Sequence, residues 1–279
     1  MIPTLQHAFS EVEDLNHIEH FVRNLKRAES AALLLDYDGT LAPFTIDRQH
    51  AVPYPGVVEH VQQIMKSCST RVVIISGRPV REVVALLKLS PAPEIWGSHG
   101  FERPLPDGTT RTPRIELETS QALADAGQWV ADQGFRDLTE LKPGGIAIHW
   151  RGLPEETIFD IRERVLRTWF PIAQCVRLTV MEFDGGIEMR IADFDKGYAV
   201  RTIVSEMPSD APIAYLGDDS TDEHAFEALG ARGLSVLVRP VHRRTSAQAW
   251  LKPPEDLLDF LARWASACRS RRDEQGCVA

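Results

Sequence analysis

The segment 31-AALLLDYDGT-40 is the part of the sequence that decides the fold class. Its first five residues form an apolar run without the alternation of a half-exposed strand, which indicates a strand buried on both faces. Asp36 and Asp38 follow this run directly, and Gly39 marks a turn. Ligands of open α/β sheets bind just beyond the carboxyl ends of such strands, so we expect a site here.

Three further apolar runs resemble the first one, and helical periodicity separates them. The runs are residues 71–75, 213–216 and 234–238, and the helical stretches are residues 57–66, 79–87, 198–206 and 222–229. Buried strands that alternate with helices predict an α/β protein with a mostly parallel, doubly wound sheet.

The middle of the chain has a different pattern. Proline and glycine mark its turns, and two helical stretches alternate with strands of period two. The helices are expected at 120–133 and 155–169, and the strands at 145–150, 176–183 and 186–191. This pattern predicts an α+β insertion, so we expect a core of residues 1–103 and 192–279 and an inserted domain of residues 104–191.

Composition excludes several classes of protein. The 279 residues include 31 Lys and Arg against 40 Asp and Glu, a formal net charge of −9. This acidic balance argues against a nucleic-acid binder, which shows a basic surplus or stripe. No apolar run approaches the roughly 18 residues of a membrane span, and the N-terminus lacks the features of a signal peptide. We therefore expect a cytoplasmic protein without a nucleic-acid or membrane partner, either monomeric or a small oligomer.

The acidic pair after the first strand suggests chemistry on phosphorus. One carboxylate at a strand end can act as a nucleophile and form an aspartyl-phosphate. A second carboxylate nearby can give a proton to the leaving oxygen and later activate water. Asp36 and Asp38 are placed for these roles, although both could instead form an Asx-type turn.

Polar residues also follow the second strand. The hydroxyl of Ser76 and the amides of Gly77 and Arg78 come just before a helix, where unpaired N–H groups favour a phosphate oxygen. Ser76 could alternatively be the N-cap of that helix, and the two roles are compatible.

The third strand ends in 217-GDDSTDE-223, which carries four acidic side chains within six residues. Such a cluster is costly unless a cation neutralises it, and Mg²⁺ prefers carboxylate and phosphate oxygens. The alternative is a solvated acidic helix N-terminus. Lys196, which precedes another helix, could shield a carboxylate from an anionic substrate, although it could also be an ordinary surface lysine.

Taken in order, these four segments resemble the four motifs of the haloacid dehalogenase-like phosphatases. Within that superfamily the sequence is most similar to the trehalose-6-phosphate phosphatases. The narrower resemblance rests on segments outside the shared motifs and on an extended fourth motif. These segments are 97-GSHGFE-102, 140-ELK-142, 149-HWR-151, 186-GIE-188 and 217-GDDSTDE-223.

The resemblance implies a Rossmann-like core with a cap inserted between the second and third motifs. It implies Mg²⁺-dependent hydrolysis of trehalose 6-phosphate, with Asp36 as nucleophile and Asp38 as acid and then base. Ser76 and Lys196 are expected to hold the phosphoryl oxygens. The implied metal ligands are Asp36, Asp38 through its backbone carbonyl, and Asp218, with Asp219 in or beside the shell. The implied substrate-binding residues are Gly77, Arg78, His99, Glu102, Lys142 and Glu188.

The sequence departs from the family pattern at two places. The segment before Lys196 lacks the usual proline, and Asp195 stands where asparagine is usual, while Trp150 replaces a tyrosine. The sugar is therefore less well determined than the reaction. Alternatives are sucrose phosphate, mannosylglycerate phosphate or an aminosugar phosphate, or a non-catalytic phosphatase-like domain. Lys142 and Glu188 could likewise form only a salt bridge within the cap.

Overall fold

A computed structural model describes residues 11–45, 47–67, 69–105 and 107–276. Its larger half is built on a six-stranded parallel sheet of order β12-β11-β10-β1-β2-β3. The strands are β1 Ala31–Leu35, β2 Thr70–Ile75, β3 Glu94–Trp96, β10 Ile213–Gly217, β11 Leu234–Val238 and β12 Ala249–Leu251. The chain proceeds outward from β1 in both directions, so the crevice for a ligand lies at the carboxyl end of β1.

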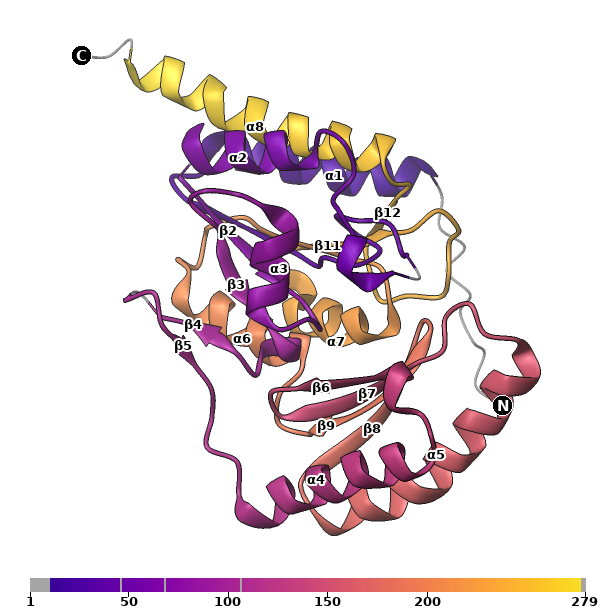
Figure 1. Cartoon of the computed structure of the whole chain (residues 1–279). Coiled ribbons are helices and arrows are strands. Elements are labelled where there is room, and N and C mark those ends of the chain that lie inside the picture. The colour runs from indigo at the N-terminus through magenta and orange to yellow at the C-terminus, as the bar shows by residue number, and fades with distance from the viewer. Residues whose placement is uncertain (1–10, 46, 68, 106, 277–279) are drawn as a thin grey trace, which may run out of the picture.

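Helices cover both faces of this sheet (Figure 1). Side chains alternate along β1, so that Leu33 and Leu35 join one apolar cluster and Ala32 and Leu34 join the other. This double burial explains why the run is apolar throughout. The first cluster includes α1 Glu11–Arg27, α2 Val57–Ser67, α3 Val80–Leu87 and α8 Glu255–Gly276, and the second includes α6 Lys196–Glu206 and α7 Ser220–Leu229.

A four-stranded antiparallel sheet of order β6-β7-β9-β8 forms the smaller half, which we call the cap. Two long helices pack on one of its faces through a third apolar cluster that includes Val130, Ile148 and Trp169. The other face is turned toward the core (Figure 1). The elements are α4 Leu117–Asp132, β6 Thr139–Lys142, β7 Gly145–His149, α5 Glu155–Cys175, β8 Leu178–Phe183 and β9 Gly186–Ile191.

The remaining elements are short. They are a two-stranded ribbon, β4 Arg103–Pro104 and β5 Thr110–Arg111, and the 3₁₀ turns η1 Arg48–His50, η2 Ser98–Gly100, η3 Arg136–Leu138 and η4 Gly230–Arg232. The predicted α/β class, with a parallel sheet and an α+β cap, is confirmed. Within the described ranges, no helix has the length and apolar character that a membrane crossing requires.

Candidate active site

The centre of the site is one lysine between two buried carboxylates. The amide of Asp36 donates to the carbonyl of Leu216 at 2.9 Å, which extends the pairing of β1 with β10 and fixes Asp36 at the strand end. Lys196, the first residue of α6, places Nζ 2.7 Å from Asp36 Oδ1 and 2.8 Å from Asp222 Oδ1. All three residues are buried. The lysine is therefore a fixed cation rather than a solvated surface group.

Burial and the neighbouring charges decide the ionisation of this cluster. Burial raises the pKa of Asp36 to about 7, although the charge of Lys196 opposes this. Burial alone lowers the pKa of Lys196, but Asp222 and Asp36 outweigh it and raise that pKa above its ordinary value. Lys196 thus stays charged, and its charge favours the ionised form of Asp36.

Asp222 supports this arrangement from the first turn of α7. Its Oδ1 accepts from Lys196 and from the hydroxyl of Tyr215, and its Oδ2 accepts from the amides of Asp218 and Asp219 at 3.1 and 3.0 Å. Both oxygens are already used by the protein. Asp222 therefore fixes Lys196 and the loop after β10, as expected of a supporting acid.

Asp218 provides the observation that points to a cation. Among the described residues, neither of its buried carboxylate oxygens has a hydrogen-bond partner. Burial, together with the charges of Asp36 and Asp222, raises the pKa of Asp218 well above its ordinary value. Each of the three carboxylates offers an oxygen within 4.8 Å of the others. A divalent cation that prefers oxygen ligands fits these residues, because it would neutralise buried charge that is otherwise costly.

The turn after β1 requires glycine for two reasons. Gly39 has a φ of +82°, in the left-handed region that favours glycine. A Cβ added there would also lie 2.3 Å from Asp218 Oδ2. Gly39 therefore allows the turn with Asp36 and Asp38 to approach the acidic loop after β10.

Arg78 holds the second aspartate of that turn. Its Nε and NH2 donate to Asp38 Oδ2 and Oδ1 at 2.6 and 2.7 Å, and Arg78 is itself buried. Ser76 contacts Arg78 through the main chain, because its Oγ accepts from the amide of Arg78 at 3.1 Å. Pro79 is the N-cap of α3, so the interpretation of Ser76 as the helix cap is wrong.

Lys142 and Glu188 form a buried ion pair on the cap face. Lys142 Nζ lies 2.8 Å from Glu188 Oε1, and Nε2 of His99, a core residue, lies 2.9 Å from Glu188 Oε2. Burial raises the pKa of Glu188, but Lys142 and His99 outweigh it, and the pKa falls well below its usual range. The pair is thus buried between cap and core and is not a surface salt bridge.

The loop after β3 positions His99 over the second motif. A Cβ on Gly77 would lie 2.7 Å from His99 Nε2, so glycine at this position gives the ring its space. Glu102 connects this loop to the start of α3, because its carboxylate accepts from Ser98 Oγ at 2.8 Å and from the amide of Val80 at 3.2 Å. Glu102 therefore holds the loop that carries His99.

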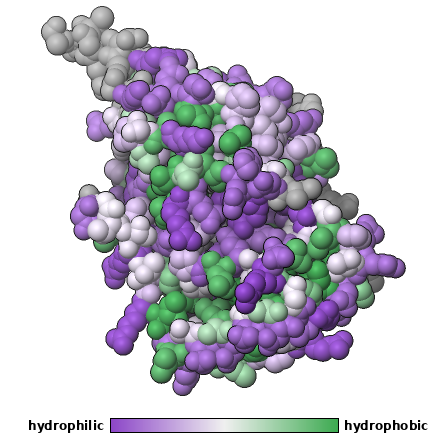
Figure 2. Space-filling view, viewed as in Figure 1, coloured by the Kyte–Doolittle hydropathy of each residue, from purple (hydrophilic) through white to green (hydrophobic). Residues whose placement is uncertain are grey.

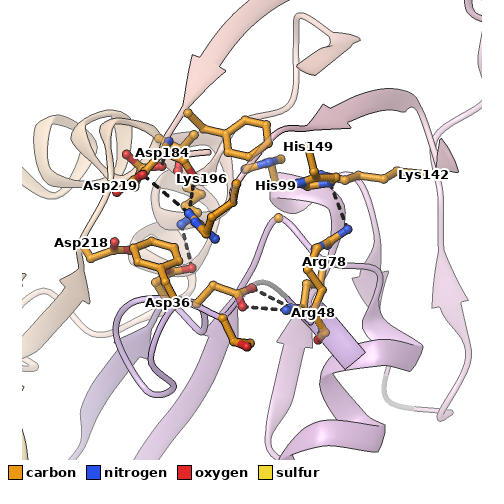
Figure 3. Close-up of a pocket in the computed structure, with 17 residues that line it drawn as sticks. Asp36, Arg48, Arg78, His99, Lys142, His149, Asp184, Lys196, Asp218 and Asp219 are labelled. Carbon is orange, nitrogen blue, oxygen red and sulfur yellow. Dashed lines mark hydrogen bonds and ion pairs between the residues drawn. The ribbon is translucent and has the colours of Figure 1, made fainter. Parts of the chain in front are cut away.

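A pocket between cap and core joins these groups, and the band between the two halves is largely hydrophilic on the face shown in Figure 2. Seventeen residues line it, as Figure 3 shows. Of the described candidates, Ser76, Glu102 and Glu188 do not line the pocket. Those that line it are Asp36, Asp38, Gly77, Arg78, His99, Lys142, Lys196, Asp218 and Asp219.

Asp219 is engaged by the protein on both carboxylate oxygens. Its Oδ1 accepts from the amide of Ser220 at 2.6 Å, as the N-cap of α7, and its Oδ2 accepts from the amide of Asp184 at 2.9 Å. Asp184 lies in the turn between β8 and β9 and also pairs with Arg239 at 2.9 Å. In this arrangement Asp219 links the cap hairpin to the acidic loop.

Several residues at the site were not expected from the sequence. Arg48 reaches from the core to Glu140 and His149 of the cap, and Asp184 and Arg239 join the cap hairpin to the loop after β10. An arginine in a polar loop and an aspartate in a DGG turn carry no local signal. Tyr215 did carry one, because a tyrosine hydroxyl in a buried strand needs a polar partner.

Comparison with known proteins relates this chain to one family of phosphatases. The trehalose-phosphatase family matches residues 34–254 of the chain. A trehalose-phosphate phosphatase of Mycobacterium marinum is 34% identical over 250 residues, which is 84% of this chain and 61% of that protein. The chain thus spans less than two thirds of this relative.

Two solved structures share the fold. The C-terminal domain of C. albicans trehalose-6-phosphate phosphatase aligns with a TM-score of 0.76 at 21% identity, over 89% of this chain and 96% of that one. A haloacid dehalogenase-like hydrolase from B. subtilis aligns with a TM-score of 0.60 at 14% identity, over 83% and 99%. At these identities the likeness concerns the fold.

Proposed function

This chain belongs to the trehalose-phosphatase family, and on that premise we propose that it hydrolyses trehalose 6-phosphate to trehalose and phosphate. The reaction passes through an aspartyl-phosphate on Asp36 and uses Mg²⁺. The observation that carries the proposal is the buried cluster at the ends of β1 and β10, where Asp36 pairs with Lys196 and the oxygens of Asp218 accept no hydrogen bond from the part of the chain that the structure describes. Such a cluster suits the attack of a carboxylate on an anionic phosphoryl group.

The reaction proceeds in two halves. A carboxylate oxygen of Asp36 bonds to phosphorus, the bond from phosphorus to the sugar oxygen breaks, and Asp38 gives that oxygen its proton. Asp38 then takes a proton from water, whose oxygen bonds to phosphorus while the bond to Asp36 breaks and phosphate leaves. Lys196 stays charged throughout and offsets the negative charge on the phosphoryl group. Ser76, which does not line the pocket, supports the phosphate end by accepting from the amide of Arg78.

Mg²⁺ would be held by the carboxylates of Asp36 and Asp218 and the backbone carbonyl of Asp38, with Asp219 in or beside that shell. When bound, it supplies positive charge that screens the anionic substrate from the acidic cluster. The protein's own residues position the reacting groups: Asp222 fixes Lys196, and Arg78 orients Asp38.

We assign residues 104–191 to the cap and the choice of sugar to its inner face. Lys142 and His99 line the pocket and carry polar groups that can hydrogen-bond sugar hydroxyls, and Glu188 behind them pairs with both. Gly77 and Arg78 line the same pocket on the core side, where we place the phosphate. Glu102 contributes through the loop that it supports. A sugar without the matching hydroxyls leaves these buried groups unpaired, which gives selectivity.

Phosphate release from a panel of sugar phosphates, with and without Mg²⁺, tests the proposal. The panel contains trehalose 6-phosphate, sucrose phosphate, mannosylglycerate phosphate and an aminosugar phosphate. We expect trehalose 6-phosphate to be the best substrate, and Asp36→Asn to lose at least about a thousandfold in kcat. Asp210→Asn, at an exposed position, is the matched control. Equal phosphate release by the wild type and by Asp36→Asn would refute the mechanism. Faster release from another sugar phosphate would show that trehalose 6-phosphate is not the preferred substrate.

A further inference from the structure

Arg48 crosses from the core to the cap with its side chain. It begins the short turn η1, and its guanidinium binds both oxygens of Glu140 on β6, with NH2 3.0 Å from Oε1 and NH1 2.6 Å from Oε2. NH1 also lies 3.0 Å from His149 Nε2 on β7. This is a two-pronged contact between sequence segments 92 residues apart.

The partner of Arg48 is an ionised carboxylate in a largely buried place. The Glu140 side chain is only 11% exposed, and Lys142 Nζ lies 3.6 Å from its Oε2. Burial raises the pKa of Glu140, but Lys142, His149 and Arg48 together hold it below its usual range. Of these three neighbours Arg48 belongs to the core, so its pairing with Glu140 ties the cap to the core.

The main chain of the same residue reaches the catalytic turn. The carbonyl of Arg48 accepts from Arg78 NH1 at 2.9 Å, and the other two donor nitrogens of Arg78 hold Asp38. Because Arg78 is buried and each end of its guanidinium is occupied, a shift of the Arg48 backbone changes the orientation of Arg78. A continuous set of contacts thus runs from Glu140 through Arg48 and Arg78 to Asp38.

We propose that Arg48 is a positioning residue that couples the closed cap to the orientation of Asp38. The inference rests on the proposed function, which gives Asp38 its role as acid and base. With the cap closed, the pair with Glu140 fixes η1, the Arg48 carbonyl fixes Arg78, and Arg78 orients the carboxyl of Asp38. Proton delivery to the sugar oxygen is then efficient when the cap is in place.

Leaving groups of different basicity test this coupling. A sugar alkoxide needs a proton as it leaves, whereas p-nitrophenolate does not, so misplacing Asp38 affects the sugar ester more. We expect Arg48→Ala to lower kcat/KM for the sugar phosphate about tenfold and for p-nitrophenyl phosphate less than about threefold. Arg48→Lys, which keeps the charge without the two-pronged contact, should show a partial loss. Gln49→Ala, an exposed neighbour in η1, is the matched control.

A double variant separates positioning from a merely structural role. In an Asp38→Asn background, Arg48→Ala should cause no further loss with the sugar phosphate, because its effect is exerted through Asp38. Additive losses, or equal losses on both esters, would overturn the inference. Thermal unfolding identifies any variant that fails to fold, in which case Arg48→Lys carries the test. Failure of the proposed function is distinct, because Asp36→Asn would then release phosphate as the wild type does.

Discussion

The two sides of the pocket hold their charges in different ways. On the core side, Asp36, Lys196 and Asp222 pair with one another, and all three come from strand ends and helix starts of one parallel sheet. On the cap side, carboxylates pair with core residues across the boundary, as Glu188 does with His99 and Glu140 does with Arg48. The core groups therefore make these pairs without any cap residue, whereas Glu188 and Glu140 of the cap each have a partner in the core.

This difference predicts that the core side of the pocket carries out the chemical step and that the cap side determines which sugar is accepted. If the core cluster is independent of the cap, changing it should affect every phosphate ester equally. If the cap acts through contacts with the sugar and with the core, changing it should affect the sugar ester most. Comparing a sugar phosphate with a small aryl phosphate therefore distinguishes the two sides.

The largest effect on stability is expected when the core cation is removed. Lys196→Met leaves Asp36 and Asp222 buried without a positive partner, so we expect about 3–5 kcal/mol less free energy of unfolding. Activity should fall at least about a hundredfold on both esters. Urea unfolding and phosphate release measure the two effects, with Lys66→Met on the exposed face of α2 as the control. A loss confined to the sugar ester would show that the core depends on the cap.

A smaller effect, specific to the metal, is expected at Asp218. Asp218→Asn keeps the shape but removes a buried charge whose oxygens accept no hydrogen bond among the described residues and whose ion pair with Arg239 spans 3.8 Å. Without metal the variant should be more stable by about 1–3 kcal/mol. Thermal unfolding in EDTA and in a Mg²⁺ series measures both states, because a bound ligand stabilises by RT ln(1 + [L]/Kd).

The expected result for Asp218→Asn is at least about a tenfold weaker Mg²⁺ response than in the wild type. The control is Asp210→Asn, which removes an exposed acid in the turn before β10, at the amino end of that strand. If Mg²⁺ stabilises Asp218→Asn as strongly as the wild type, Asp218 is not a metal ligand. That outcome would overturn the proposed metal site at Asp218 and would leave the proposed role of Asp36 as nucleophile unchanged.

The core side could largely be predicted from the sequence because its groups follow buried strands. Asp36 and Ser76 come directly after apolar runs and Asp218 follows one residue later, and the carboxyl ends of parallel strands meet at one edge. Short strands were harder to predict. The three residues each of β3 and β12 give too little periodicity to detect.

The cap side could be predicted only in part. The resemblance named Lys142 and Glu188, but their partners come from segments far away in sequence, as with Arg48 and Glu140. Such pairs are set by how two sheets pack against each other, and no local pattern encodes them. The same holds for Asp219, whose bond to Asp184 depends on the cap hairpin.

A moderate effect is expected on the cap side at Glu188. Glu188→Ala removes the shared partner of Lys142 and His99, so kcat/KM for the sugar phosphate should fall about tenfold. For p-nitrophenyl phosphate the loss should be smaller, because that ester makes no sugar contacts. Glu182→Ala on β8, which pairs with Arg162, is the control. An equal loss on both esters would remove Glu188 from the selectivity of the cap.

The smallest effect is expected from the pH dependence of the cap–core contact. Burial lowers the pKa of His99, which stays neutral in the folded protein while the unfolded chain takes up a proton near its ordinary value of about 6.5. The unfolded state then binds more protons, so stability should fall as the pH drops below about 6.5. Urea unfolding at pH 7.5 and 5.5 should show a smaller loss in His99→Gln than in the wild type. His20→Gln, on the exposed side of α1, should behave as the wild type. If the free energy of unfolding of His99→Gln falls as much between pH 7.5 and 5.5 as that of the wild type, His99 does not contribute to the pH dependence of stability. The contact between His99 and Glu188 would then give the cap side no special sensitivity to acid.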